Sequence, residues 1–230
     1  MGLLQQWRKR LVHLCEVSRT EPYGDSYYWG YDLDGEKDTL WGLEGCTHPI
    51  GFFLDHVSSG IFKREMALVD KDELLRTTQG LGSPDYDLHH YDQVGGCLKR
   101  TDDPDSDSKT SFVVVNHYWA NDESGRDKIL DSLSRFAAQI LENQNQVQSA
   151  LVLKECRDKN LGTLWLRSVE TTQASLPLPL TSHRLESSQA WEGLQTSSLF
   201  NLLTTEIQSL TVSIESHRSQ SFNGHLGLRD

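Results

Sequence analysis

Two histidines are the side chains of this sequence best placed to move a proton. His56 follows a run of hydrophobic residues, and His117 lies near the end of a segment rich in β-branched and aromatic residues. Histidine exchanges a proton near neutral pH, so each could be a catalytic base or a hydrogen-bond donor. Asn116 or Tyr118, on either side of His117, could orient an oxyanion that forms on a substrate. We therefore take His56, His117 and Asn116 as candidate catalytic residues.

Each histidine also has a structural interpretation, and the sequence leaves both interpretations open. His117 could be a core or interface histidine bonded to a backbone carbonyl, and His56 could pack a helix against a neighbouring strand. Successive side chains of a strand point to opposite faces, so Asn116 and His117 cannot share one site without a β-bulge. His48 precedes Pro49, so it either contacts a substrate or caps the helix that begins there.

Four aromatic residues are candidates for contacts to a flat ligand, because their rings offer large stacking surfaces. They are Trp41, Trp165, Tyr28 and Tyr118. The alternative for both tryptophans is packing in the core. Tyr28 belongs to a segment with more aromatic residues than a simple core strand needs, so some of these rings could line a pocket.

The sequence has no pattern typical of a metal or cofactor site. His89 and His90 are adjacent, and Asp87 and Asp92 are the nearest further ligands. Adjacent strand residues face opposite ways, so we expect ordinary strand histidines rather than a metal site. Serine triads, glycine-rich phosphate loops and zinc-ligand spacings are absent from the sequence.

The second half of the chain gives the clearest pattern of elements that could position these residues. Its hydrophobic periodicity predicts strand, helix, strand, strand, helix and strand. The corresponding segments are Ser111–Ala120, Arg126–Glu142, Val147–Glu155, Thr163–Val169, Ser188–Leu203 and Leu210–Ser216. One layer of helices over an antiparallel sheet is an α+β fold, and this order is the ferredoxin-like βαββαβ unit.

The first half repeats this order but begins at its helix, without a preceding strand. We predict a helix from about residue 4 that stops near Ser18, strands at Ser26–Asp32 and Thr39–Gly45, and a helix over Ile50–Leu68, broken around Gly60. A strand follows at 86–93. The missing first strand would lie between the third and fourth. Another segment such as the C-terminal tail could fill the gap, the strands could close directly, or the chain could be truncated.

Short matches between the halves support a duplication. Thr39-Leu40-Trp41 and Thr163-Leu164-Trp165 are identical, and the stretch from His56 to Phe62 aligns with that from Leu194 to Phe200. An acidic segment at 101–110 reads as a linker. We therefore expect repeat 1 over 1–100, repeat 2 over 111–218 and a polar tail over 219–230.

The stretch from His56 to Phe62 resembles the antibiotic biosynthesis monooxygenase (ABM) family. In that family the second helix carries a His, small residues and then an aromatic residue, and the third strand tends to be of the Thr-Leu-Trp type. The chain is similar to fungal tandem members found near polyketide pathways. The resemblance implies two tandem ferredoxin-like units forming an internal dimeric α/β barrel, with the first unit lacking its first strand. Leu194 replaces the helix His in the second copy.

Members of this family that oxidise aromatic polyketides need neither metal nor flavin. The resemblance therefore implies a cofactor-independent oxygenase or oxidase that uses molecular oxygen on a phenolic, polyketide-like aromatic substrate. The protein would deprotonate the substrate, stabilise the anion and exclude water. A non-oxidative cyclase, decarboxylase or isomerase on the same fold is an alternative, as is a binding protein without activity. A function in haem binding, like that of some relatives, is a more remote alternative.

Composition limits the partners and the compartment. The 230 residues include 22 basic and 33 acidic side chains, a formal net charge of −11, which is unlike the basic surface of a nucleic-acid-binding protein. Acidic surfaces also disfavour anionic membranes, and no segment has the ~20 apolar residues of a membrane helix. The four cysteines are scattered and the N-terminus has no signal-peptide core, so we expect reduced thiols and a cytoplasmic protein. The expected partners are a small aromatic substrate and, in a homodimer, a second copy of the chain.

Overall fold

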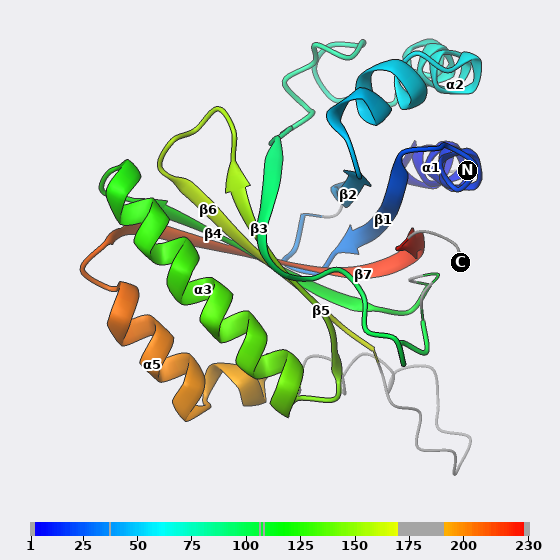
Figure 1. The fold of residues 1–230 in the computed structure, drawn as a ribbon. Helices are drawn as coiled ribbons and strands as arrows, with labels where there is room; N and C mark the ends of the chain where they lie inside the picture. The colour runs from blue at the N-terminus through cyan, green and yellow to red at the C-terminus, as the bar shows by residue number, and fades with distance from the viewer. Residues whose placement is uncertain (1–2, 37, 106, 108, 170–190, 228–230) are drawn as a thin grey trace. The chain divides into compact units, whose positions relative to one another are not determined.

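The computed structural model describes residues 3–36, 38–105, 107, 109–169 and 191–227. The chain divides into two compact units (Figure 1). Unit 1 comprises Met1–Leu88, Ser106–Lys109 and Ser221–Asp230, and unit 2 comprises His89–Asp105 and Thr110–Gln220. Both units combine helices with antiparallel strands, so the predicted mixture of helices and antiparallel sheet is confirmed.

Unit 2 contains the six elements predicted for the second half, in the predicted order. They are β4 (Phe112–Ala120), α3 (Glu123–Asn143), β5 (Val147–Glu155), β6 (Leu161–Ser168), α5 (Ser198–Ile207) and the first part of β7 (Thr211–Leu226). The strand order is β7-β4-β6-β5-β3, where β3 is Tyr91–Cys97. The first strand of the βαββαβ series is therefore central, as a ferredoxin-like arrangement requires.

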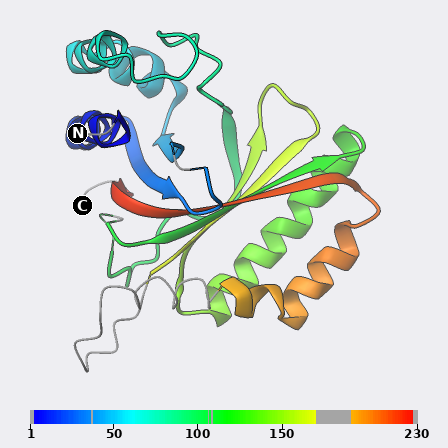
Figure 2. The same cartoon turned by 180° about the vertical axis from the view of Figure 1, so that it is seen from behind.

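Helices α3 and α5 of unit 2 lie on the same face of its sheet (Figures 1 and 2). The Asp122 side chain caps α3 by accepting a hydrogen bond from the Gly125 backbone at 2.7 Å. The buried residues of α3 recur every three or four positions: Ile129, Leu133, Phe136, Ala137 and Ile140. This apolar stripe packs on the sheet, and Phe136 also meets Phe200 of α5 at 6.0 Å between ring centroids.

Unit 1 contains α1 (Leu3–Ser18), β1 (Gly24–Asp32), β2 (Leu40–Cys46), the π-helix η1 (Gly51–His56) and α2 (Gly60–Lys71). The predicted helix break near Gly60 is confirmed, because η1 ends at His56 and α2 begins four residues later. The core of the unit consists of Leu14, Cys15, Tyr27, Phe62, Met66, Val69 and Leu74. An ion pair of 2.8 Å between Arg10 and Asp72 joins α1 to the end of α2.

The short sequence match between the two halves starts a helix in each unit. The Ser59 hydroxyl caps α2 by accepting a hydrogen bond from the Phe62 backbone at 3.0 Å. Ser197 caps α5 in the same way, with the Phe200 backbone at 3.1 Å. The matched small and aromatic residues therefore form the N-terminal cap of a helix in both halves. This local match does not by itself confirm the predicted tandem ferredoxin-like units.

The structure does not confirm the first half as a βαββαβ unit that lacks only its first strand, and this stays a prediction. The sheet of unit 1 has the order β2-β1-β7, and the strand that follows α2 in sequence, β3, pairs with β5 in unit 2. The C-terminal residues do enter unit 1, but next to β1 rather than between a third and a fourth strand. The internal barrel concerns the placement of the two units and stays a prediction.

The end of β7 corrects the expectation of a polar tail over 219–230, since β7 extends to Leu226. The Phe222 ring lies 4.8 Å from that of Tyr31, and the Ser18 hydroxyl is hydrogen-bonded to Nε2 of His225 at 2.8 Å. The Arg19 guanidinium donates to the Gly224 carbonyl. Side-chain contacts to α1 and β1, which local periodicity does not reveal, keep these polar residues in a strand.

Strand β3 runs from Tyr91 to Cys97, whereas the sequence predicted a strand over 86–93 that ends before Gly95 and Gly96. The two glycines instead lie within the strand, at a register shift opposite β5. Gly96 has φ 79°, and an added Cβ would come within 1.8 Å of the Ala150 carbonyl oxygen. Only glycine fits at position 96, next to the bulge between Gln93 and Gly95, so a residue type that usually ends a strand continues one here.

The acidic segment at 101–110 contributes to packing in unit 2 through Asp103. This carboxylate forms an ion pair with Arg167, a buried residue of β6 that also donates to the Ser149 hydroxyl at 2.9 Å. None of the four cysteines is in a disulfide. Within the described ranges, no helix is both long and apolar enough to cross a membrane. The predicted helix over Ser188–Leu203 lies partly outside the described residues, which resume at Trp191.

Candidate functional site

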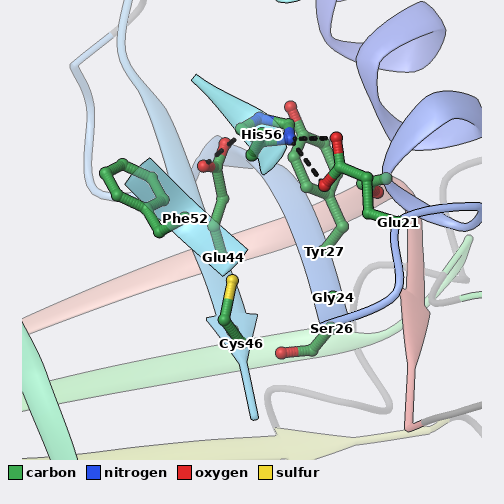
Figure 3. Close-up of a pocket in the computed structure, with 10 residues that line it drawn as sticks. Glu21, Gly24, Ser26, Tyr27, Glu44, Cys46, Phe52 and His56 are labelled. Carbon is green, nitrogen blue, oxygen red and sulfur yellow. Dashed lines mark hydrogen bonds and ion pairs between the residues drawn. The ribbon is translucent and has the colours of Figure 1, made fainter. Parts of the chain in front are cut away.

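His56 lies at the end of η1 between two carboxylates of unit 1 (Figure 3). Its Nδ1 atom is 2.9 and 3.0 Å from the two carboxylate oxygens of Glu21, which follows α1. Its Nε2 atom is 3.8 Å from Oε2 of Glu44 on β2, an ion-pair distance beyond hydrogen-bond range. The ring is therefore held by one carboxylate and faces a second.

Strand pairing and the π-helix explain how these groups meet. Tyr27 of β1 is the direct partner of Glu44 in the antiparallel ladder, so their side chains share one face. The His56 ring lies 5.8 Å from Tyr27, 6.3 Å from Phe52 and 5.1 Å from Phe62, measured between ring centroids. Aromatic rings thus surround the imidazole and remove it from water.

The space in this cluster is small. Its volume is about 10 Å³, which is room for about one water molecule. The lining includes Glu21, Tyr27, Glu44, Phe52 and His56, all within unit 1. Figure 3 shows these side chains around the same space, which is much smaller than an aromatic substrate. Any large substrate must therefore meet the edge of the cluster.

The charges around His56 favour its protonated form. Burial alone would lower the pKa of His56, but the hydrogen bond to Glu21 and the negative charge of Glu44 outweigh burial and raise it. Burial raises the pKa of Glu44, and the nearby His56 partly offsets this effect. The cluster can hold a proton on the imidazole and accept another on Glu44. It therefore contains the proton donor and acceptor groups that acid–base catalysis requires.

A second cluster surrounds His117 in unit 2. The Nδ1 atom of His117 is 2.9 Å from the Thr163 hydroxyl and 3.4 Å from the Tyr91 hydroxyl. The rings of His89 and His217 lie 5.5 and 5.8 Å away, between centroids. Burial, followed by the charges of His89 and His217, lowers the pKa of His117 to about 4. This imidazole is neutral at physiological pH.

The structure separates the residues predicted around His117. Asn116 and Tyr118 alternate with His117 along β4, as expected, and Tyr118 pairs with Gly162, which lies under Leu130 of α3. Asn116 and Tyr118 therefore point toward α3, whereas His117 points away from it. The Asn116 amide nitrogen is buried without a hydrogen-bond partner among the described residues. Burial raises the pKa of Tyr118.

The remaining aromatic candidates occupy different places. Trp165 is buried and is the partner of Val115, so it shares the face of His117. The Trp41 indole donates to the Asp32 carboxylate at 2.9 Å, and Tyr28 is buried on the face of β1 opposite to Tyr27. The Nδ1 atom of the exposed His48 accepts a hydrogen bond from the Ile50 backbone at 3.1 Å, the contact expected of a helix cap.

His56 and His117 thus belong to different units, each with its own neighbours. The catalytic and binding roles of all these residues stay predictions. No group of three His, Cys, Asp or Glu side chains within the described ranges is arranged to hold a metal ion.

Comparison with solved structures relates the chain to three other proteins. A protein from Fusobacterium nucleatum, provisionally described as a monooxygenase, superposes with a TM-score of 0.73 at 9% identity, covering 98% of this chain and 89% of that one. A Lactobacillus acidophilus protein described in the same way gives a TM-score of 0.67 at 9% identity, covering 95% and 89%. An anthrone oxidase-like protein gives 0.58 at 12% identity, covering 96% and 87%.

At these identities the likeness shows a shared fold. No protein-family model and no curated protein matches the sequence. The fold is therefore one also found in proteins described as monooxygenases and in an anthrone oxidase-like protein, as the sequence resemblance led us to expect at the level of architecture.

The sequence did not reveal the partners of either histidine. Glu21 and Glu44 are 35 and 12 positions from His56, in a turn and a strand with no recognisable motif. Thr163 belongs to the Thr-Leu-Trp match, but only its place opposite His117 in the ladder gives it a role. The one available signal was an acidic residue, Glu44, within a strand that otherwise consists of small and apolar residues.

Proposed function

We propose that this protein is a cofactor-independent oxygenase or oxidase that acts on a phenolic, polyketide-like aromatic substrate with molecular oxygen. The observation that carries the proposal is His56, buried among aromatic rings and placed between Glu21 and Glu44. Such a cluster can remove a proton from a weakly acidic O–H or C–H bond and retain the charge inside the protein.

Apart from removing this proton and retaining the charge, the protein has little to contribute to the reaction. Dioxygen reacts slowly with neutral closed-shell molecules, but an electron-rich phenolate or enolate can itself supply the first electron. Forming that anion is therefore the step that a protein must assist, and excluding water protects the reactive intermediate. The fold shared with an anthrone oxidase-like protein and with two proteins described as monooxygenases supports the same reaction class.

Oxygen consumption tests the proposal directly. The purified full-length protein, given an anthrone in air, should consume oxygen without added flavin, metal or nicotinamide, and a chelator should not change the rate. His56→Gln should reduce the rate at neutral pH, because the cluster loses the ring that faces both Glu21 and Glu44. His13→Gln, which changes a partly exposed histidine of α1, is the matched control and should retain the rate.

Two results would contradict the proposal. Oxygen uptake that is absent, or that disappears with the chelator, would exclude cofactor-independent oxygenation of this substrate class. Product formed equally well under strict anaerobiosis would instead select the non-oxidative cyclase, decarboxylase or isomerase.

A further inference from the structure

We infer that Glu44, rather than His56, is the residue that takes the proton from the substrate, and that His56 is a positioning residue behind it. The inference rests on the proposed function and deepens it by naming the atoms that meet the substrate. It follows from the exposure of each side chain in the cluster, and from the directions of the two imidazole nitrogens, one bonded to Glu21 and the other facing Glu44.

Exposure distinguishes the three groups. The side chain of His56 is 4% exposed and that of Glu21 is 10% exposed, whereas that of Glu44 is 25% exposed. The enclosed volume of about 10 Å³ cannot admit a phenol, whose ring alone is several times larger than a water molecule. A substrate that approaches the edge of the cluster therefore meets Glu44 before it can meet His56.

The two nitrogens of His56 are directed at carboxylates. Nδ1 is hydrogen-bonded to Glu21, and Nε2 faces Glu44 at 3.8 Å, buried and without a hydrogen-bond partner among the described residues. A substrate could therefore contact Nε2 only if the side chains around it moved, whereas Glu44 is already partly exposed. The imidazole is instead placed to act on Glu44 as a fixed positive charge.

The proton step balances within this cluster. An O–H bond of a phenol, or a C–H bond beside its carbonyl tautomer, breaks, and its electron pair stays on the substrate as phenolate or enolate. The proton moves to an oxygen of Glu44. Before the step the cluster holds two carboxylates and one imidazolium, and after it holds one carboxylate, one carboxylic acid and one imidazolium. The cluster itself thereby loses one negative charge, and that charge now lies on the substrate anion, where the imidazolium behind Glu44 offsets it.

Hydrogen exchange under anaerobic conditions tests the inference independently of oxygen chemistry. The full-length protein is incubated with anthrone in D₂O without oxygen, and loss of the methylene proton signal is followed by NMR. Glu44→Gln should slow the exchange on the order of 10²-fold or more, because the amide cannot accept the proton. Glu36→Gln, at an exposed carboxylate in the turn between β1 and β2, should exchange at the wild-type rate.

The pH profile separates a positioning role from a catalytic one. In the wild type the rate should fall on the acid side as Glu44 becomes protonated. His56→Gln removes the positive charge that lowers the pKa of Glu44, so its acid limb should move to higher pH while activity persists above it. Glu44→Asp retains a carboxylate and should recover part of the rate lost in Glu44→Gln. Thermal melting of each variant reports whether it is folded.

The outcomes distinguish this inference from the proposed function. Exchange that survives in folded Glu44→Gln but is lost at every pH in His56→Gln would overturn the inference and make His56 the contacting base. Wild-type exchange without oxygen uptake in air would contradict the oxygenase while leaving the role of Glu44 intact. An absence of exchange in the wild type would overturn the inference whatever the oxygen measurement gives.

Discussion

His56 and His117 are both buried histidines close to aromatic rings, but their neighbours differ in charge. His56 of unit 1 meets the carboxylates of Glu21 and Glu44, and these raise its pKa. His117 of unit 2 meets the hydroxyls of Thr163 and Tyr91 and two further histidines, and its pKa falls to about 4. Burial acts in the same direction at both sites, so the identity of the neighbours decides which form of the ring is stable.

The comparison separates two kinds of site. The first imidazole has a raised pKa, so its cationic form is more favoured than in an ordinary histidine, and that form stabilises negative charge next to a carboxylate of raised pKa. The second is neutral and aligned by hydroxyl groups, so it can donate or accept a hydrogen bond but retains an added proton poorly. Of the two sites, unit 1 is therefore the better suited to taking a proton from a substrate.

The largest expected effect comes from making the first site resemble the second. In the double variant Glu21→Gln with Glu44→Gln, only burial remains to act on His56, so its pKa should fall below that of an ordinary histidine. Oxygen uptake should decrease at least about 10²-fold. NMR titration of the His56 ring in the folded variant checks the first effect. A pKa that stays raised would contradict the assignment of the shift to these two carboxylates.

A smaller effect is expected on acid stability, with the opposite sign at the two sites. The pKa of His117 is about 4 when folded and 6.5 in the unfolded reference, so the unfolded state binds the proton more strongly. Below pH 6.5 this difference progressively lowers the free energy of unfolding, by about 3 kcal/mol once the pH reaches the folded value. His117→Gln should remove this contribution, and urea unfolding at pH 7 and pH 4.5 measures it.

Equal pH dependence in His117→Gln and in the wild type would show that His117 is not held neutral by folding.

For His56 the linkage operates at the other end of the pH range. Its folded pKa lies above the unfolded value, so its stabilising contribution is complete below the unfolded pKa and is lost as pH rises through the folded pKa. Urea unfolding between pH 6 and pH 9 should therefore show a decline in the wild type that is weaker in His56→Gln. An identical decline in both proteins would rule out this source of stabilisation.

The smallest expected effect concerns the hydroxyl that aligns His117. Thr163→Val replaces a hydroxyl by a methyl group of similar size and leaves Nδ1 of His117 with the longer contact to Tyr91, which should cost about 1 kcal/mol of unfolding free energy. Thr163→Ser retains the hydroxyl and should cost less. Oxygen uptake should remain near the wild-type value in both variants, and a large loss would move the proposed site from unit 1 to unit 2.

Much of the fold could be predicted because it depends on nearby residues. The periodicity of α3, the alternation in β4 and the serine-capped starts of α2 and α5 are local patterns, so the sequence predicted these elements and the βαββαβ order of the second half. Strand β7 was predicted too short because its last residues become a strand through contacts with α1 and β1.

By itself, the sequence determined which segments form most of the helices and strands, and it identified His56 and His117 as candidate catalytic histidines. Only the tertiary structure decided which charges they meet, because Glu21, Glu44 and Thr163 reach them through a turn and cross-strand pairs that join distant positions. An imidazole titrates according to the few groups within several ångströms of its ring, and chain folding alone sets that neighbourhood.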